Sequence, residues 1–354
     1  MKRFSKEIIA WYLINKRDLP WRNTNDAYLI WLSEIILQQT RVDQGMAYYL
    51  KFASNFPTVK HLAKAHSDKV MKLWQGLGYY SRARNLHETS QIIASVYKGK
   101  FPDVYEDILS LKGIGEYTAA AIASFAFNKP HAVVDGNVYR VLSRVFGIET
   151  PIDSSIGKKE FYQLANELID KKNPGLFNQA IMELGAIQCK PINPDCSLCP
   201  LNAMCFAFAK KRITELPVKE KKTKVRNRFL YYIVVNYKGK TIINKRIGND
   251  IWKNLYDFPL IETAKELSET EFFGSEQWQQ FIGETSYTIT SVSSIHKHIL
   301  SHQKIFARFV EINCESSFSK LVSDTAIIIN KKDIQKYAVP RLVDIYLEKR
   351  IKEK

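Results

Sequence analysis

The chain has 354 residues, of which 45% are hydrophobic and 25% are charged. This composition is typical of a folded globular protein and excludes wholesale disorder, and the length predicts two domains, since domains hold roughly 100–200 residues. The formal net charge of +16 favours a polyanion as the partner, above all nucleic acid, with a solvated basic surface and anionic lipid as alternatives.

The N-terminal segment predicts an amphipathic helix rather than an export signal. Residues 8–14 form an apolar run that is too short for a signal peptide, and the polar segment 15–18 (NKRD) follows it where a small-residue cleavage site would stand. No stretch approaches the roughly 18 apolar residues of a membrane span. We therefore expect a cytoplasmic protein, associated with the nucleoid if it is bacterial, that does not bind membranes.

Apolar residues at three- and four-residue spacing predict that residues 1 to about 205 are all-α. Such segments lie at 31–39, 70–74, 117–127, 138–146 and 177–187. Within the first of them, Glu34 stands among apolar neighbours, where burial would raise the pKa of its carboxyl. An exposed position is the alternative, since isolated acids in apolar helices usually lie on the polar face.

Two glycines, Gly113 and Gly115, lie in a turn between two predicted helices. Glycine lets the backbone approach a phosphate closely, and the following helix offers free N–H groups and its positive dipole end. The turn therefore predicts a phosphate site, with a tight turn that binds nothing as the alternative.

Asp135 follows an apolar stretch and precedes a predicted helix, so an N-cap is one interpretation. It also offers a second carboxylate to pair with Glu34. A partly protonated carboxyl can act as a general acid, while an ionised one stabilises a positively charged sugar transition state. The two acids are therefore candidates for a catalytic pair.

Four of the five cysteines, Cys189, Cys196, Cys199 and Cys205, form the closely spaced pattern C-x6-C-x2-C-x5-C. A cytosolic protein keeps its thiols reduced, which favours metal binding over disulfides. Structural zinc sites usually show two short C-x2–4-C pairs, whereas an iron-sulfur cubane accepts uneven spacing. The pattern favours one [4Fe-4S] cluster, with zinc and free buried cysteines as alternatives.

A basic stretch separates the helical part from a region with β-strand signals. Residues 210–228 contain nine Lys or Arg against two Glu, which predicts an exposed linker. Beyond it, residues 229–237 and 240–246 are predicted to form a β-hairpin through the turn at 238–239. Residues 305–312 predict another strand, so the second part is expected to be α+β.

Several longer motifs stand in a fixed order between residues 1 and 205. They are residues 19–22 (LPWR), 31–40 (WLSEIILQQT), 76–85 (GLGYYSRARN), 111–115 (LKGIG), 134–137 (VDGN) and the cysteine quartet. Together they resemble the adenine DNA glycosylases of the MutY family, which belong to the helix-hairpin-helix, endonuclease III-like superfamily.

The resemblance implies a domain organisation. Its parts are a helix-hairpin-helix catalytic region at 1–209, with a six-helix barrel at about 25–130 and a helical [4Fe-4S] cluster domain from 1–24 and 131–209; a basic linker at 210–226; and an α+β Nudix-like domain at 227–354. Residues 251–259 resemble the tryptophan loop of that domain. The chain contains no acidic Nudix box, so pyrophosphate hydrolysis is not expected.

The resemblance also implies a monofunctional glycosylase. It would excise adenine mispaired with 8-oxoguanine or guanine in double-stranded DNA after flipping the base, and would act as a monomer. Glu34 is the implied acid that protonates adenine at N7. Asp135 is the carboxylate that stabilises the oxocarbenium-like sugar or bonds to it transiently. Tyr117 and Asn137 match residues that accompany this pair.

The other implied site residues fall into three groups. They are Trp21, Arg22 and Glu183 at the adenine pocket; Gln39 and Tyr79 as side chains inserted into the base stack, with Gly113 and Gly115 in the DNA-binding turn; and Ser301 and His302 as readers of the oxidised guanine. In the last group Leu300 replaces the family's phenylalanine, which removes an aromatic contact. A surface strand, or a metal site of His296, His298 and His302, is the alternative for that stretch.

Two other functions stay open from the sequence. An endonuclease III-like glycosylase with lyase activity has a lysine nucleophile just after its hairpin, where this chain has Tyr117. A non-enzymatic iron-sulfur protein that binds DNA would need the cysteines, the glycine turn and the positive charge, but not Glu34.

Overall fold

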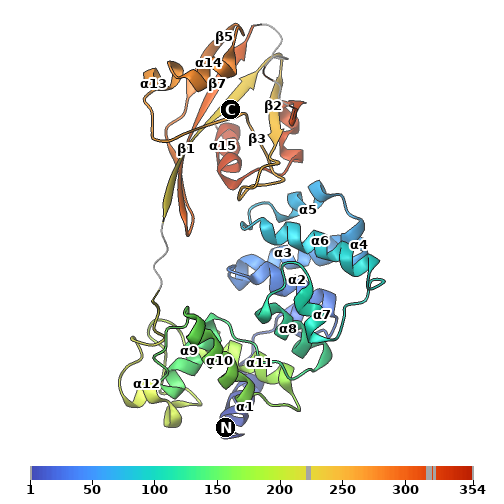
Figure 1. Ribbon diagram of the computed structural model, residues 1–354, viewed down its shortest axis with the longest axis vertical. Helices are drawn as coiled ribbons and strands as arrows, with labels where there is room; N and C mark the ends of the chain where they lie inside the picture. Colours follow the sequence, from blue (N-terminus) through green and yellow to red (C-terminus); the bar gives the residue numbers. More distant parts are fainter. Residues whose placement is uncertain (1, 221–224, 316–320, 322–323, 353–354) are drawn as a thin grey trace. The chain divides into compact units, whose positions relative to one another are not determined.

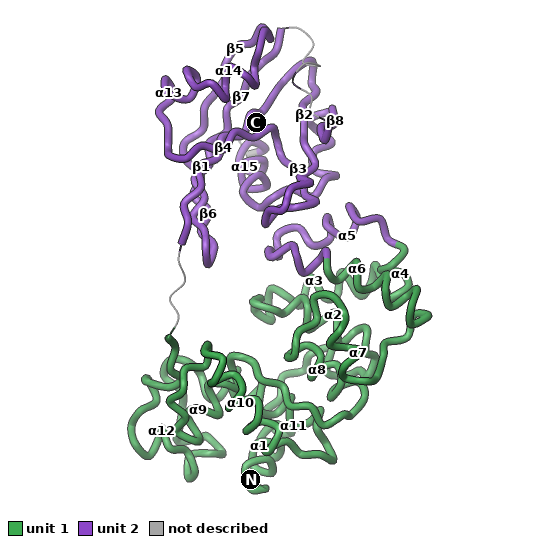
Figure 2. The backbone as a smooth tube through the Cα atoms, viewed as in Figure 1, with its two compact units in different colours: residues 1–64, 85–222 green, residues 65–84, 223–354 purple. Residues whose placement is uncertain are grey.

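The structure is a computed structural model that describes residues 2–220, 225–315, 321 and 324–352. The chain divides into two compact units: unit 1 comprises Met1–Lys64 and Asn85–Lys222, and unit 2 comprises Ala65–Arg84 and Thr223–Lys354 (Figure 2). The grouping of residues 65–84 with the C-terminal part is not predictable from sequence patterns. None of the described helices is long and apolar enough to cross a bilayer.

Unit 1 is built of helices (Figure 1), which agrees with the all-α prediction. They are α1 (Lys2–Asn15), η1 (Pro20–Arg22), α2 (Ala27–Leu37), α3 (Val42–Asn55), α4 (Val59–Lys64), α6 (Ser81–Ser95, which begins in unit 2), α7 (Tyr105–Ser110), α8 (Glu116–Phe127), α9 (Gly136–Phe146), α10 (Ser155–Leu168), α11 (Pro174–Glu183), η2 (Leu184–Gln188), η3 (Asn202–Met204) and α12 (Phe206–Ala209). The helix predicted at 31–39 ends earlier, at Leu37, because Gln39 has a left-handed backbone with φ of 54°. The segment predicted at 177–187 leaves α-helical geometry after Glu183 and continues as the π-helical turn η2.

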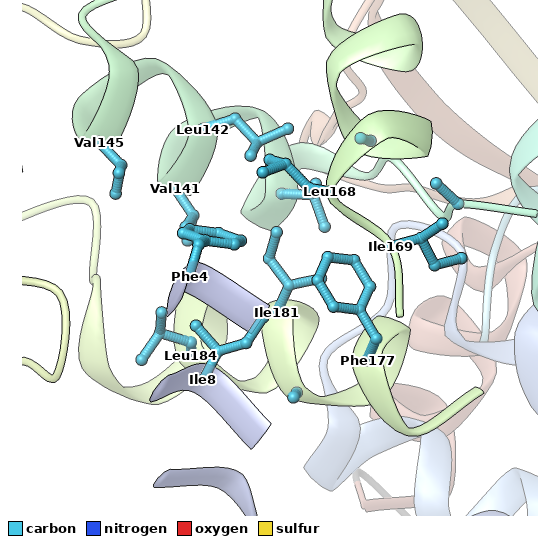
Figure 3. Packing of buried hydrophobic residues seen from close by; sticks show 14 of the residues in the cluster. Phe4, Ile8, Val141, Leu142, Val145, Leu168, Ile169, Phe177, Ile181 and Leu184 are labelled. Atoms are coloured by element: carbon cyan, nitrogen blue, oxygen red, sulfur yellow. The ribbon is translucent and has the colours of Figure 1, made fainter. Parts of the chain in front are cut away.

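The N-terminal helix α1 packs against helices that lie more than a hundred residues later in the chain (Figure 3). Phe4 and Ile8 of α1 are buried in one cluster with Val141 of α9 and with Phe177 and Ile181 of α11. Burial of each such side chain stabilises the fold by roughly 1.5–3 kcal/mol. The core that supports α9 and α11 therefore includes the first residues of the chain.

The predicted linker at 210–220 is largely exposed, as expected, but it also packs against unit 1. Leu216 is buried, and its carbonyl oxygen accepts a hydrogen bond of 3.1 Å from Nε of the buried Arg144. Val218 accepts a backbone bond from Ile152, so this stretch packs on unit 1. One apolar residue within a basic run is enough to anchor it, which a count of charges does not reveal. Residues 221–224 of the predicted linker lie outside the described residues.

Unit 2 contains two sheets, α5 (Ser67–Trp74) and the remaining helices. The first sheet has the strand order β4-β1-β7-β5, with β6 also paired to β7, and the second has the order β3-β2-β8. The elements are β1 (Arg226–Asn236), β2 (Lys240–Lys245), β3 (Tyr256–Asp257), β4 (Leu260–Thr263), α13 (Glu269–Phe273), α14 (Glu276–Ile282), β5 (Tyr287–Val292), β6 (His296–Ile299), β7 (Gln303–Cys314), β8 (Ala326–Asn330), η5 (Lys331–Lys336) and α15 (Arg341–Lys352). The α+β prediction is confirmed.

The predicted hairpin of β1 and β2 forms only at its turn. Lys238 and Gly239 have left-handed backbones, and Tyr237 and Lys240 exchange two backbone hydrogen bonds. Beyond this bridge the strands enter different sheets, because β1 pairs in parallel with β7 while β2 pairs with β3 and β8. The local turn signal was correct, but the long-range pairing of β1 with β7 decided the topology.

Successive residues of β1 point to opposite faces of the first sheet, and each face is covered by helix. Tyr231 stacks on Phe272 of α13 with ring centroids 4.2 Å apart. On the other face Tyr232 stacks on Phe309, which in turn stacks on Tyr346 of α15. The middle of β1 in this sheet is therefore buried on both faces.

Candidate active site

Unit 1 contains a cavity of about 490 Å³ whose walls come from four separate parts of the chain: residues 17–43, α8, the start of α9, and α11 with η2. A volume of this size suits a small organic group. Among its lining residues are Trp21, Arg22, Glu34, Tyr117, Asp135, Asn137 and Glu183. The fold therefore brings together every residue that the sequence predicted for the chemistry and for adenine binding.

Glu34 is buried in the wall of this cavity. It belongs to α2, whose N-cap Asp26 accepts hydrogen bonds from the backbone of Tyr28 and Leu29. Only 7% of Glu34 is exposed, and this burial raises the pKa of its carboxyl to about 7, against an opposing hydrogen bond from Tyr117. The predicted burial of this acid is confirmed, and the alternative of an exposed acid is excluded.

Asp135 is the N-cap of α9, as its position in the sequence indicated. Its Oδ1 accepts hydrogen bonds from the backbone N–H groups of Asn137 (2.9 Å) and Val138 (2.8 Å), and its Oδ2 accepts one from the Asn137 side chain (2.8 Å). Burial raises the pKa of this carboxyl in spite of these three donors. The cap fixes the direction of the carboxylate at the cavity wall, so a capping role and a chemical role are compatible.

Arg140 is a residue that the sequence did not single out. Its guanidinium donates to Oδ1 of Asn137 (2.9 Å), to the carbonyl oxygen of Gly185 (2.7 Å) and to that of Cys189 (2.8 Å). The Arg140 side chain thus contacts both Asn137, whose amide holds Asp135, and the backbone of Cys189, the first cysteine of the quartet. The sequence indicates this role only through spacing: Arg140 lies about one helical turn after Asn137, so the two side chains share a face of the predicted helix.

Glu183 is fully buried and is held by two arginines. Arg17 donates from its backbone N–H (2.9 Å), Nε (2.8 Å) and Nη2 (2.6 Å), and Arg22 donates from Nη1 (3.0 Å) and Nη2 (2.7 Å). Burial alone would raise the pKa of Glu183, but these bonds hold it at about 2, so the carboxylate stays charged. Both of its oxygens are occupied by the guanidiniums, so Glu183 orients Arg22 and Arg17 at the cavity. Sequence reasoning missed Arg17.

The glycine turn between α7 and α8 has the predicted features of an anion site. Gly113 has φ of 78°, and a Cβ there would lie 2.6 Å from Cβ of Asn85, so a larger residue would be strained and crowded. Gly115 is the N-cap of α8 and offers no side-chain cap, while a Cβ there would meet nothing within 4 Å. The first N–H groups of α8 are therefore open to a ligand.

Gln39 and Tyr79, predicted to insert into DNA, share an unusual backbone. Their φ angles are 54° and 46°, in the left-handed region that residues other than glycine seldom adopt. Both are exposed, and each follows closely on the end of a helix, α2 or α5. Gln39 lies in unit 1 and Tyr79 in unit 2.

The four predicted cluster cysteines are all partly buried and line one small apolar cavity of unit 1. Arg144 anchors the loop between them by donating to the carbonyl oxygens of Lys190 (2.7 Å) and Pro191 (3.1 Å), and its Nη1 lies 3.5 Å from Sγ of Cys189. Within the described part of the chain, no group of three or more Cys, His, Asp or Glu side chains is arranged to hold a metal ion.

The predicted reader residues, 300–302, form the tip of the hairpin between β6 and β7. The backbone N–H of Leu300 donates to the carbonyl oxygen of Gln303 at 2.8 Å, which closes the turn. Ser301 and His302 are exposed and lie within hydrogen-bond distance of each other, with Oγ 3.2 Å from Nδ1. The strand alternative is correct for the preceding residues, since β6 covers His296–Ile299.

Two family descriptions match the chain. The HhH-GPD superfamily of base excision DNA repair proteins matches residues 32–171, and the NUDIX domain matches residues 230–349. The first match contains Glu34, Tyr117 and Asp135, and the second contains the β6–β7 hairpin.

Curated relatives cover most of the chain. An adenine DNA glycosylase of Buchnera aphidicola subsp. Acyrthosiphon pisum is 38% identical over 264 residues, which is 74% of this chain and 75% of that protein. The one of Buchnera aphidicola subsp. Baizongia pistaciae is 33% identical over 89% of this chain and 88% of its own length. The human adenine DNA glycosylase is 43% identical over 58% of this chain and 39% of its own.

Solved structures resemble the helical part. A thermostable thymine-DNA glycosylase is 31% identical with a TM-score of 0.55, covering 59% of this chain and 96% of its own. Endonuclease III in a trapped covalent complex with DNA has a TM-score of 0.51 over 58% of this chain and 94% of its own; at 20% identity this likeness concerns the fold alone.

Proposed function

The chain belongs to the adenine DNA glycosylases, and from that membership we propose that it excises adenine that stands opposite 8-oxoguanine or guanine in double-stranded DNA. The observation that carries the proposal is the buried carboxyl of Glu34, whose pKa is raised to about 7 by burial at the wall of a cavity large enough for a base. A proton donor in a site of this size can act on a base that has been flipped out of the helix.

The proposed first step is protonation of the flipped adenine by Glu34. The proton goes to N7, the bond between C1′ and N9 breaks, and its electron pair leaves with the base. A group with a pKa near neutral serves well, because a substantial fraction of it is protonated at neutral pH and it still releases its proton readily. The Tyr117 hydroxyl, whose own pKa is raised well above 10 by burial, stays a hydrogen-bond donor and fixes the orientation of the Glu34 carboxyl.

The proposed role of Asp135 is to stabilise the sugar after the base has left. The oxocarbenium-like sugar carries positive charge near C1′, and a carboxylate held by three donors on α9 is positioned for it before the reaction starts. Water then adds at C1′ and gives up a proton to the Glu34 carboxylate, which leaves an abasic site and restores the protonated acid. Asn137 is a positioning residue, because its amide holds Oδ2 of Asp135.

A monofunctional reaction is favoured over a lyase reaction. Strand cleavage through a Schiff base requires a lysine amine next to the sugar. Where the lyases have that lysine, this chain has Tyr117, and the described residues that line the cavity include arginines but no lysine. A non-enzymatic DNA-binding protein would not need two buried carboxyl groups, Glu34 and Asp135, in the wall of one cavity.

We propose that the C-terminal unit reads the oxidised guanine through Ser301 and His302. Both side chains are exposed at the tip of a two-stranded hairpin, where a hydroxyl and an imidazole can approach a base edge. The β7 strand that supports this tip lies between β1 and β5 in the first sheet, and its residues from Phe309 to Ile312 are buried, so it provides a fixed base for recognition.

We propose that Cys189, Cys196, Cys199 and Cys205 hold one [4Fe-4S] cluster. The donor set fits, because four thiols line a single apolar cavity and uneven spacing suits a cubane. When bound, the cluster would order the loop at 189–205 through four iron–thiolate bonds.

The test is a single-turnover assay on duplexes that contain adenine opposite 8-oxoguanine, adenine opposite guanine, or adenine opposite thymine. Adenine release from the first two without strand scission before alkali treatment is expected. Release of no base from any duplex would overturn the proposal, and scission that is trapped by borohydride would establish the lyase alternative.

A further inference from the structure

The Tyr79 turn and the proposed reader of oxidised guanine belong to the same compact unit. Unit 2 contains Tyr79, in the turn after α5, together with residues 300–302, whereas Glu34 and Asp135 lie in unit 1 (Figure 2). The segment 65–84 is more than a hundred residues away from the C-terminal part in sequence. Side-chain contacts must therefore hold it in this unit.

The first contact is made by Asp68 near the start of α5. Its Oδ1 forms an ion pair of 2.7 Å with Nζ of Lys245 on β2, and its Oδ2 accepts a hydrogen bond of 3.0 Å from the hydroxyl of Tyr256 on β3. Both charged side chains are only about one third exposed, so solvent and salt screen this pair less than a surface pair. Asp68 thus connects the start of α5 to strands β2 and β3 of the second sheet.

The second contact is made by Lys72 and Gln75 at the other end of α5. Nζ of Lys72 donates to the carbonyl oxygen of Tyr337 (2.9 Å). The Gln75 amide donates to Oδ1 of Asp344 (3.0 Å) and accepts from the backbone N–H of Val339 (3.3 Å). Lys72 and Gln75 thus bond to backbone groups of the segment that precedes α15 and to the side chain of Asp344 in the first turn of α15. Backbone groups at the start of a helix have no partners within the helix.

The Tyr79 turn itself is fixed at both ends. The Arg82 guanidinium lies over the rings of Trp74 and Tyr79, at 5.1 and 5.6 Å, and donates to two carbonyl oxygens of the turn. Beyond it, Nη1 of Arg84 donates to the carbonyl oxygen of Lys253 in the tryptophan loop (2.9 Å). The turn is therefore held between α5 and the C-terminal part.

We propose that Asp68, Lys72, Gln75 and Arg84 form a latch that couples insertion of Tyr79 into DNA to recognition of the oxidised guanine by residues 300–302. The inference rests on the proposed function and on the insertion of Tyr79 into the base stack that the sequence predicts. The four latch residues are positioning residues: they touch no DNA in this scheme, and they make the Tyr79 turn move with the reader rather than independently. Loss of the latch leaves Glu34 and Asp135 intact, so adenine is still excised, but the preference for adenine opposite 8-oxoguanine over adenine opposite guanine decreases.

The experiment compares the full-length wild type with Gln75→Ala and with Lys245→Met, which break the latch from its two sides. Asp103→Ala, which loses an exposed ion pair with Lys129 in unit 1, is the matched control. Single-turnover excision is measured at low enzyme on adenine opposite 8-oxoguanine and opposite guanine. The ratio of the two rates should fall roughly fivefold or more in each latch variant, the lower range for coupling between two sites. The control should keep the wild-type ratio.

Two further measurements separate coupling from a general loss of structure. At saturating enzyme the guanine mispair should be processed at the wild-type rate by both latch variants. Adding Ser301→Ala to Gln75→Ala should lower the ratio little beyond the larger single effect, because coupled sites are not additive. The exchange of charges in Asp68→Lys with Lys245→Asp should restore part of the preference that Lys245→Met loses.

The outcomes distinguish the two proposals. A wild-type protein that excises no adenine overturns the proposed function. A wild type that prefers the oxidised mispair, beside folded latch variants with the same preference, overturns the latch alone. Fully additive effects of Gln75→Ala and Ser301→Ala would also overturn it, since independent sites contribute separately.

Discussion

The Tyr117 hydroxyl donates a hydrogen bond of 2.7 Å to Oε2 of Glu34, across 83 positions of sequence. Burial raises the pKa of Glu34, and this hydrogen bond, which favours the ionised form, partly offsets the effect, so that the pKa lies at about 7. One side chain therefore both orients the proposed acid and sets how much of it is protonated at neutral pH.

The first prediction concerns pH. Only protonated Glu34 can give a proton to adenine, so the excision rate at low enzyme should be high below pH 7 and fall as the pH rises through about 7. Tyr117→Phe removes a bond that lowers the pKa of Glu34, and the decline should then move to higher pH. Single-turnover rates between pH 5.5 and 9 check this. A decline that moves to lower pH in Tyr117→Phe would contradict it.

The second prediction is that Glu34→Gln binds DNA but does not excise adenine. Glutamine keeps the shape and a hydrogen-bonding group, yet it has no proton to transfer, which should cost roughly a hundredfold to ten-thousandfold in rate. Gel-shift titration and single-turnover excision are measured on the same preparation. Excision near the wild-type rate would show that Glu34 is not the general acid.

The third prediction separates the two roles of Asp135. Asn is also a good N-cap, so Asp135→Asn should keep the thermal stability of the fold while it loses excision, because a neutral amide stabilises a cationic sugar poorly. Asp135→Ala should lose excision and about 1 kcal/mol of stability as well. Thermal unfolding and excision rates on both variants test this, and active Asp135→Asn would refute the role of charge.

The proposed catalytic pair could be predicted because its signals are local. Glu34 stands in an apolar helix and Asp135 stands where a helix begins, and both properties are visible in a few neighbouring residues. The ion pair between Glu183 and Arg17 was not predictable, since the two residues are 166 positions apart in the sequence. Their contact depends on how α11 packs against the N-terminal segment.

Long-range pairing also explains where the fold departed from expectation. The sequence predicts the turn at Lys238 and Gly239, but no local signal shows that β1 pairs with β7, 77 residues later, rather than with β2. In the same way the buried Leu216 ties a basic segment to unit 1 through Arg144. Local propensity identifies the elements, whereas partners are decided by the core that they bury together.

The fourth prediction concerns the cysteines. The purified protein should be yellow-brown, with about four irons per chain, and Cys199→Ser should lose iron and colour together. DNA affinity should fall because the loop at 189–205 loses its order, although Glu34 is unaffected. Iron analysis, the visible spectrum and gel-shift titration check this. A colourless wild type that contains zinc would contradict the cluster.

The fifth prediction concerns Ser301 and His302 at the tip of the β6–β7 hairpin. Removal of one or two hydrogen bonds to the oxidised base should cost about 1–3 kcal/mol of discrimination. Ser301→Ala combined with His302→Ala should therefore slow excision opposite 8-oxoguanine at low enzyme more than excision opposite guanine. At saturating enzyme the double variant should excise adenine from both mispairs at the wild-type rate, because the cavity in unit 1 is unchanged.

Ser294→Ala is the matched control for this experiment, since Ser294 is an exposed serine of the same unit that precedes β6. The control should keep the wild-type ratio of rates on the two mispairs, whereas the double variant should bring that ratio closer to one. An unchanged ratio in the double variant would mean that the hairpin tip does not read the oxidised base. Restoring the family's aromatic residue through Leu300→Phe should raise the ratio in a protein whose Ser301 and His302 are intact, because the added ring supplies an apolar contact while the two hydrogen bonds remain.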